Sequence, residues 1–162
     1  MNLTITTDAS FSKTYNVGTY AFWISCKGGP FKKSGVLREM SRNSSHAEMK
    51  CICNALAFTL KLSPTITERV KSIHINTDSM NSIHLFSGDK EAIRRYKLTS
   101  KACLRVLAKY NELIKMLPGR KIIFTHIKAH THTNTPAYYV NGWCDAEAKS
   151  WMHIKLNHLK TT

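Results

Sequence analysis

Two short β-branched segments of this 162-residue chain end in the same way, with an aspartate directly after a threonine. The first is Ile5-Thr6-Thr7-Asp8, and the second is Ile75-Asn76-Thr77-Asp78. A small residue and a turn or helix start follow each acid, which is typical of the end of a strand. Because the carboxyl ends of parallel strands meet at one edge of a sheet, the repeat predicts two neighbouring carboxylates there.

The remaining pattern predicts an α/β chain. Strands are expected over residues 3–8, 18–26, 31–40, 70–77 and 122–127. Helices are expected from just after residue 44, over residues 79–86 and 100–116, and from about Asp145 onward. A hairpin-rich start followed by alternating strands and helices predicts a mixed sheet with helices on its faces. The length fits one domain, residues 1–162.

The charge balance favours a polyanionic partner. The chain has 24 Lys and Arg against 10 Asp and Glu, a formal net charge of +14 and a pI near 9.8. Such an excess of positive charge is typical of proteins that bind nucleic acid. No apolar run approaches the roughly 18 residues that cross a bilayer, so no membrane role is expected. Five cysteines without a disulfide-scaffold pattern indicate reduced thiols and a cytoplasmic location.

The two repeated aspartates have the same orientation within their segments. Asp8 shares the parity of Thr6, and Asp78 shares that of Asn76, so both oppose the aliphatic side chains beside them. Each acid alone can be read as a turn or helix-capping residue, a role that the Asp78-Ser79 pair suits. The matched pair in a chain with so few acids favours a shared metal site.

Two further acids can join this pair. Ser45-His46-Ala47-Glu48 fits a capping box, in which the glutamate closes back on the start of its helix. Glu48 also lies next to the expected buried stripe, from which it can lean toward the aspartates. In the last helix, Asp145 or Glu147 can supply the fourth carboxylate, and the spacing does not choose between them. Clustered carboxylates in a basic protein predict a divalent-cation site.

Three histidines raise a zinc alternative, because His126, His130 and His132 precede Cys144. Their spacing matches no structural zinc pattern, and the chain has no Cys-x-x-Cys motif. A histidine in a polar segment beside a metal site is better placed for proton transfer.

Five short motifs, taken in order, resemble type 1 ribonuclease H. They are an early Thr-Asp, a Ser-x-x-Ala-Glu that opens a helix, Thr-Asp-Ser after a strand, Ile-Lys-Ala-His, and Cys-Asp before the final helix. Each motif alone is weak, but their order and spacing cover nearly the whole chain. The resemblance implies a ribonuclease H-like fold, a five-stranded mixed sheet in the order 3-2-1-4-5 flanked by helices on both faces.

The resemblance also implies a metal centre. Asp8, Glu48, Asp78 and Asp145 would hold two Mg²⁺ ions, with Mn²⁺ able to substitute and Asp8 bridging both ions. Without metal, four acids so close would repel one another, which predicts raised pKa values for some of them. The family hydrolyses the RNA strand of RNA–DNA hybrids and leaves 5′-phosphate and 3′-hydroxyl ends.

The resemblance also implies residues that assist the reaction and residues that bind the hybrid. The chain is expected to be a monomer. His130, or else His132, would assist proton movement or product release. Residues near the acids would contact the minor groove and 2′-hydroxyls, namely Ala9, Ser10, Ser44, Ser45 and Ser79. A basic protrusion would grip the hybrid through Lys90, Arg94, Arg95, Lys97 and Lys101.

The chain departs from the family pattern in places. Ala9 replaces a usual glycine, Ser44-Ser45 replaces an asparagine pair, and the segment from residue 130 to 145 is longer than usual. Two other functions stay open: a DNA strand-cutting nuclease of the same fold, and a non-catalytic module that binds hybrid or duplex RNA. The Thr-Asp-Ser and Lys-Ala-His motifs favour the ribonuclease, and the intact set of four acids counts against the non-catalytic module.

Overall fold

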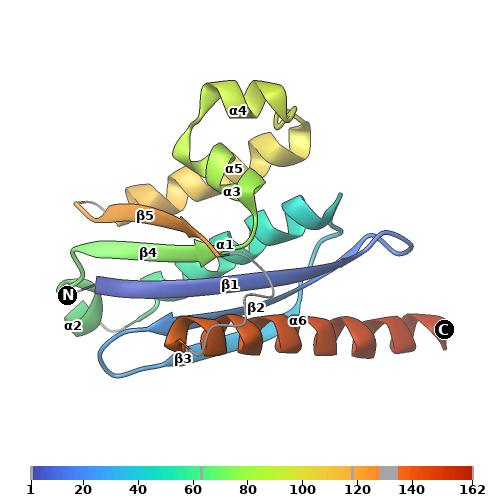
Figure 1. Ribbon diagram of the computed structural model, residues 1–162, viewed down its shortest axis with the longest axis horizontal. Coiled ribbons are helices and arrows are strands. Elements are labelled where there is room, and N and C mark those ends of the chain that lie inside the picture. The colour runs from blue at the N-terminus through green and yellow to red at the C-terminus, as the bar shows by residue number, and fades with distance from the viewer. Residues whose placement is uncertain (1, 63, 118, 128–134, 162) are drawn as a thin grey trace.

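The computed structural model describes residues 2–62, 64–117, 119–127 and 135–161. Within them, five strands form one mixed sheet in the order β3-β2-β1-β4-β5, which confirms the predicted fold class and strand order (Figure 1). The strands are β1 (Asn2–Ser12), β2 (Val17–Ser25), β3 (Phe31–Val36), β4 (Ser72–Thr77) and β5 (Lys121–His126). The helices are α1 (Ser44–Leu60), α2 (Pro64–Thr67), α3 (Met80–Ser87), α4 (Lys90–Arg95), α5 (Lys101–Lys115) and α6 (Pro136–Lys160).

The central strand β1 fixes the relation between the two repeated motifs. It pairs antiparallel with β2 and parallel with β4, where Thr6 lies opposite Asn76. Continuing this register by two residues brings Asp8 level with Asp78, which directly follows the end of β4 at Thr77. The two Thr-Asp motifs therefore occupy equivalent positions on adjacent parallel strands.

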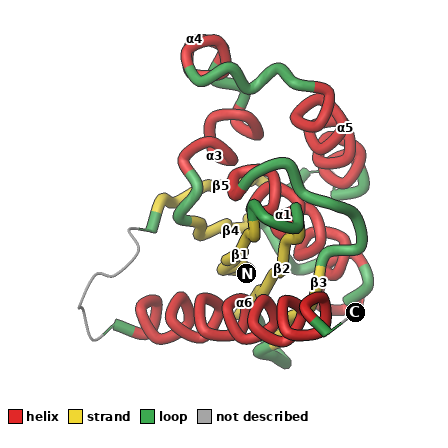
Figure 2. The backbone as a smooth tube through the Cα atoms, turned by 90° about the vertical axis from the view of Figure 1, so that its right-hand side faces the viewer, coloured by secondary structure: helices red, strands yellow, loops and turns green. Residues whose placement is uncertain are grey.

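Helices cover both faces of the sheet, with α6 on one side and α1, α3 and α5 on the other (Figure 2). The larger core lies on the α1 side and includes Ile5 and Ile52, both fully buried. On the α6 side, Ala21 of β2 packs with Cys144 and Ala148. Asp8 pairs with Ala21 across the strands, so its side chain projects from the α6 face, whereas Glu48 belongs to a helix on the opposite face.

Two strand boundaries differ from the prediction, for reasons of pairing. β1 continues past Asp8 to Ser12 because it stays paired with β2 as far as Val17. β3 ends at Val36 and not near Met40. Its last residue, Val36, pairs with Thr19 of β2, and β2 itself begins only two residues earlier, at Val17, so little of β2 remains for a longer β3 to pair with.

The start of α6 was predicted too late. The helix begins at Pro136, nine residues before Asp145, because Thr135 caps it and accepts a hydrogen bond from the Tyr138 N–H. Proline suits the first helical position, where its fixed φ is helical and no N–H is needed. Asp145 is therefore held in the interior of a long helix. Among the described helices, none combines the length and apolar character that crossing a membrane requires.

Candidate active site

Three of the predicted acids converge at the ends of β1 and β4. One carboxylate oxygen each from Asp8, Glu48 and Asp78 lies within 4.8 Å of the other two, and we call these residues the carboxylate triad. Asp8 is 6% exposed and Glu48 7%, so both acids are largely withdrawn from water. Such a group of hard oxygen donors is suited to a divalent cation.

Glu48 reaches the triad because it does not cap its helix. The cap of α1 is Asn43, whose Oδ1 accepts a hydrogen bond of 2.8 Å from the His46 N–H. The predicted capping box at Ser45 is therefore wrong, since asparagine is an equally good cap and starts the helix two residues earlier. Glu48 then lies beyond the first turn, on the side that faces β1.

A single backbone N–H orients two of the acids. The Ala9 N–H donates to Asp8 Oδ1 and to Glu48 Oε1, each at 2.9 Å. The other oxygen, Glu48 Oε2, is buried and has no hydrogen-bond donor among the described residues. A buried carboxylate oxygen without a partner is costly and needs a proton or a cation.

All three acids have raised pKa values, as the sequence predicted, but the main cause is burial. Burial raises the pKa of Asp8 to about 7, with the negative charge of Asp78 as the next cause. The pKa of Glu48 is raised well above its ordinary value by burial and then by the charge of Asp8. Burial also raises the pKa of Asp78. The repulsion predicted from the sequence is thus present and is secondary to the loss of water.

Asp145 lies beside the triad without joining it. Its charge contributes to the raised pKa values of Asp8 and Asp78, but its Oδ2 is 3.0 Å from Lys149 Nζ, one turn further along α6. Glu147, the alternative that the spacing left open, instead accepts a hydrogen bond of 2.9 Å from Ser34 Oγ on β3. The geometry therefore brings Asp145, and not Glu147, near the triad. Sequence reasoning missed Lys149, although its spacing of four residues from Asp145 is a usable signal.

An open pocket of about 430 Å³ adjoins the triad. Four predicted substrate contacts line it, namely Ala9, Ser44, Ser45 and Ser79. Ser79 caps α3, and Ser45 Oγ accepts a hydrogen bond of 3.0 Å from Asn81 Nδ2. Asn81 was missed, because only the packing of α1 beside α3 brings it to the pocket.

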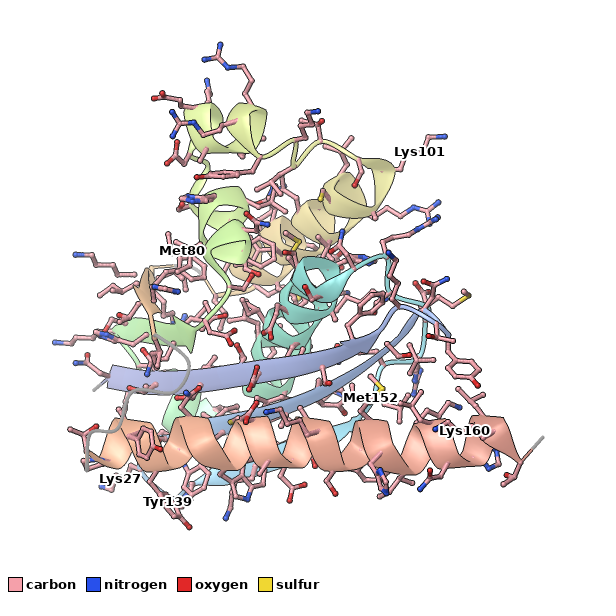
Figure 3. All side chains as sticks on the ribbon, turned by 45° about the vertical axis from the view of Figure 1, so that its right-hand side comes forward. Lys27, Met80, Lys101, Tyr139, Met152 and Lys160 are labelled. Carbon is pink, nitrogen blue, oxygen red and sulfur yellow. The ribbon has the colours of Figure 1, made fainter. Side chains whose placement is uncertain are left out.

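The two predicted contacts on β1, Ser10 and Ala9, are less available to a substrate than the three serines. Ser10 is half-buried on β1 and does not line the pocket, and the Ala9 N–H is occupied by the two acids. Met80, labelled in Figure 3, lines the pocket from the first turn of α3 and is 40% exposed.

Two of the predicted histidines, His130 and His132, lie outside the described residues. The His126 ring donates from Nε2 to the Asp78 carbonyl oxygen at 3.2 Å, which ties β5 to the end of β4. Cys144 is buried beneath the sheet, where its Sγ donates to the Thr6 carbonyl oxygen at 3.5 Å. The burial of Cys144 and this hydrogen bond count against a role as a zinc ligand.

The predicted basic protrusion contains a short helix that the pattern did not indicate. Asp89 caps α4 through a hydrogen bond to the Ala92 N–H, and α4 stands on α3 at the end of the molecule away from α6 (Figure 2). Arg94, Arg95 and Lys97 are exposed there, and Lys97 has a φ of 55°, which ends the helix sharply. Lys101, which was predicted to belong to the protrusion, is instead the first residue of α5 and lines a different surface.

Comparisons with known proteins agree with this geometry. The RNase H family model matches residues 1–153. RNase H1 from the halophilic archaeon Halobacterium salinarum is 13% identical with a TM-score of 0.68, covering 94% of this chain and 98% of that one. LC11-RNase H1, solved in complex with an RNA/DNA hybrid, is 16% identical with a TM-score of 0.70, covering 95% and 99%. The N-terminal RNase H domain of a Mycobacterium tuberculosis protein is 12% identical with a TM-score of 0.65, covering 95% and 98%.

A comparison with curated proteins finds no match. The family model and the fold are sufficient, and the chain belongs to the RNase H family. Its fold is that of the RNase H1 structures, and membership of the RNase H family places it among the nucleases, a class of hydrolases.

Proposed function

We propose that this chain hydrolyses the RNA strand of RNA–DNA hybrids and leaves 5′-phosphate and 3′-hydroxyl ends. The observation that carries the proposal is the carboxylate triad, with one oxygen of each acid within 4.8 Å of the others and with Asp8 and Glu48 buried, in a protein of net charge +14. Membership of the RNase H family and the hybrid bound to LC11-RNase H1 support the same substrate.

The residues fit a metal centre of two Mg²⁺ ions, with Mn²⁺ able to substitute. The donors are hard carboxylate oxygens, and the buried Glu48 Oε2 lacks any other partner among the described residues. Asp8, Glu48 and Asp78 would hold the ions, together with Asp145 from α6. When bound, such ions supply an activated water and stabilise the charge that develops on the transferred phosphate.

The chain itself supplies orientation and recognition. The Ala9 N–H fixes the directions of Asp8 and Glu48, so that their oxygens are arranged before a cation arrives. The hydroxyls of Ser44, Ser45 and Ser79 line the adjacent pocket, where they can recognise a 2′-hydroxyl group. A proton-transfer role for His130, or His132, stays a prediction.

Binding of the hybrid would come mainly from the basic surface. Exposed Arg94, Arg95 and Lys97 around α4 would contact phosphates and contribute affinity that falls with salt. We expect the protein to act as a monomer.

The test is a cleavage assay with an end-labelled RNA–DNA hybrid, with and without Mg²⁺, beside single-stranded RNA, duplex RNA and duplex DNA. Mg²⁺-dependent loss of the RNA strand of the hybrid alone is the expected result. Cleavage of DNA would instead assign the chain to DNA strand-cutting nucleases. Binding of the hybrid without cleavage would make it a binding module and leave the triad without a catalytic role.

A further inference from the structure

A second concave surface, separate from the carboxylate triad, carries a concentration of positive charge. This basic groove has a volume of about 1360 Å³ and is bounded by β2 and β3, the segment of residues 37–42, the outer side of α1 and the first half of α5. Eight Lys and Arg side chains line it, a third of the 24 in the chain, against the single acid Glu39. The groove is therefore strongly electropositive.

Most of these cations have no acidic partner. Lys50 is occupied, since its Nζ donates to the carbonyl oxygens of Glu39 and Met40, and Lys109 lies 3.8 Å from Glu112. The other six have no carboxylate within 4.0 Å among the residues that the structure describes. They are Lys33, Arg38, Arg42, Lys61, Lys101 and Arg105, all exposed.

The groove adjoins the triad pocket at the start of α1. Arg42 and His46 line the groove, while Ser44, Ser45 and Glu48 line the pocket, so the two surfaces meet within the first turns of one helix. From His46 to Lys61 the groove follows α1 for roughly 22 Å, at about 1.5 Å of rise per residue. A nucleic-acid strand carries one phosphate for about every 3.4 Å of helix axis, so this length corresponds to about six phosphates.

The lining chemistry indicates contact with the backbone and not with bases. Three aromatic residues line the groove: Tyr20 and Phe22 of β2, which are only 9% and 1% exposed, and Phe58 of α1, which is half-buried against the rings of Phe22 and Phe31. Proteins that stack bases present aromatic faces to solvent, and none of these three side chains is exposed. Flexible cations without a stacking surface are suited to contact backbone phosphates, whatever the base sequence.

We propose that the basic groove binds the sugar–phosphate backbone of the nucleic-acid substrate several nucleotides away from the carboxylate triad. This inference rests on the proposed function, because it assumes that a hybrid lies across the triad. It extends the substrate-binding surface along α1 to β3 and α5, in a direction separate from the protrusion at α4.

The test compares two variants with the same change of charge. The groove variant carries Lys33→Gln, Lys61→Gln and Arg105→Gln, one substitution each from β3, the C-terminal region of α1 and α5. The control variant carries Lys27→Gln, Lys121→Gln and Lys160→Gln, three exposed lysines outside the groove. Figure 3 shows Lys27 on the opposite side of the molecule from the groove residue Lys101. Equal melting temperatures of the two variants verify that both fold.

Binding is measured by fluorescence anisotropy in EDTA, with hybrids of about 8 and about 18 base pairs, across a series of salt concentrations. We expect the groove variant to bind the long hybrid on the order of tenfold more weakly per lost phosphate contact at ~0.1 M salt, with a salt slope smaller by about 0.9 per contact. Binding of the short hybrid and all binding by the control variant should change little.

Two results would overturn the inference. In the first, the groove variant binds the long hybrid as tightly as the control variant does. In the second, the groove variant loses the same affinity for the short hybrid as for the long one, which would make the effect one of total charge. Because no metal is present, this outcome does not depend on cleavage. Failure of the wild-type protein to cut the short hybrid with Mg²⁺ would sink the proposed function separately.

Discussion

The carboxylate triad and the basic groove meet at the start of α1. Each gathers side chains of one charge, negative in the triad and positive in the groove, but the two sets of side chains have different environments. One oxygen of each triad acid lies within 4.8 Å of the others, Asp8 and Glu48 are buried and Asp78 is half-buried, and the pKa values of all three acids are raised. The cations of the groove are exposed to water and spread along α1. Buried like charges are costly until a proton or metal ion joins them, whereas water and salt screen exposed ones.

This contrast separates two kinds of mutational effect. Changing a triad acid should alter the chemistry, and changing a deeply buried one such as Asp8 should also alter stability, because the fold withdraws that acid from water. Changing exposed cations should alter binding and its salt dependence, with little effect on stability. The predictions below test this separation, beginning with the largest expected effect.

The largest effect is expected from Asp78→Asn. This substitution keeps the shape of the side chain and removes the charge that a divalent cation needs. A loss of about 4 kcal/mol of transition-state stabilisation is within the contribution of a bound metal and corresponds to about 1,000-fold in rate. We expect at least this decrease in hybrid cleavage, with hybrid binding and the melting temperature nearly unchanged.

Asp89→Asn is the matched control for that substitution. Asp89 is an exposed acid that caps α4, and asparagine caps as well as aspartate does. Cleavage by this variant should equal that of the wild-type protein. Undiminished cleavage by Asp78→Asn would contradict the assignment of the triad.

The next largest effect concerns the protrusion. Arg94→Glu combined with Arg95→Glu reverses two exposed charges on α4. If both residues contact phosphates, hybrid affinity should fall about 100-fold at ~0.1 M salt, and the salt slope should flatten by about 2. Salt-dependent anisotropy measures both quantities. Unchanged affinity would show that α4 is only a solvated helix and would leave the groove as the main binding surface.

A third prediction concerns the stability of the metal-free protein. Asp8 has its ordinary pKa of 3.8 when unfolded and a pKa raised by burial to about 7 when folded. Between these pH values the folded protein binds more protons, so its free energy of unfolding falls as the pH rises. Asp8→Asn removes this loss, so it should stabilise the protein more at about pH 8 than at about pH 5, by roughly 2.5 kcal/mol.

Urea unfolding in EDTA at the two pH values measures this difference. Asparagine keeps an oxygen to accept from the Ala9 N–H, so the hydrogen bond should survive the substitution. An equal effect at both pH values would mean that Asp8 is ionised throughout. Added Mg²⁺ should stabilise the wild-type protein at the higher pH, since a ligand that binds only the folded state raises its stability.

The parts of the site that the sequence predicted are those fixed by strand register. Asp8 and Asp78 follow identical short motifs on neighbouring parallel strands, so pairing alone brings them together. Glu48 was also identified, although its local role was misread, because Asn43 and not Ser45 starts the helix. A helix cap depends on the backbone conformation of one residue, and Asn43, Ser44 and Ser45 are all polar residues suited to that role, so the sequence did not identify which of them caps α1.

The parts that the sequence did not predict depend on contacts between distant segments. The groove combines Lys33, Lys61 and Arg105 from three elements, and no spacing rule links them. The early start of α6 was missed because Pro136 and the tyrosines after it were read as part of a polar loop. That error placed Asp145 at a helix end, where its partner Lys149 was not sought.

The smallest effect is expected from Lys149→Gln, which tests how Asp145 relates to the triad. The Lys149–Asp145 pair is exposed, with side chains 62% and 40% accessible, so its loss should change the free energy of unfolding by less than about 0.5 kcal/mol. If Asp145 serves as a metal ligand, Lys149 competes with the cation for its carboxylate. The variant should then reach half-maximal cleavage at roughly twofold lower Mg²⁺, because a few tenths of a kcal/mol correspond to about twofold.

Lys160→Gln removes an equal charge from the same helix and should leave the Mg²⁺ requirement unchanged. A requirement that stays the same in both variants would place Asp145 outside the metal centre and leave the triad as its ligands among the residues that the structure describes.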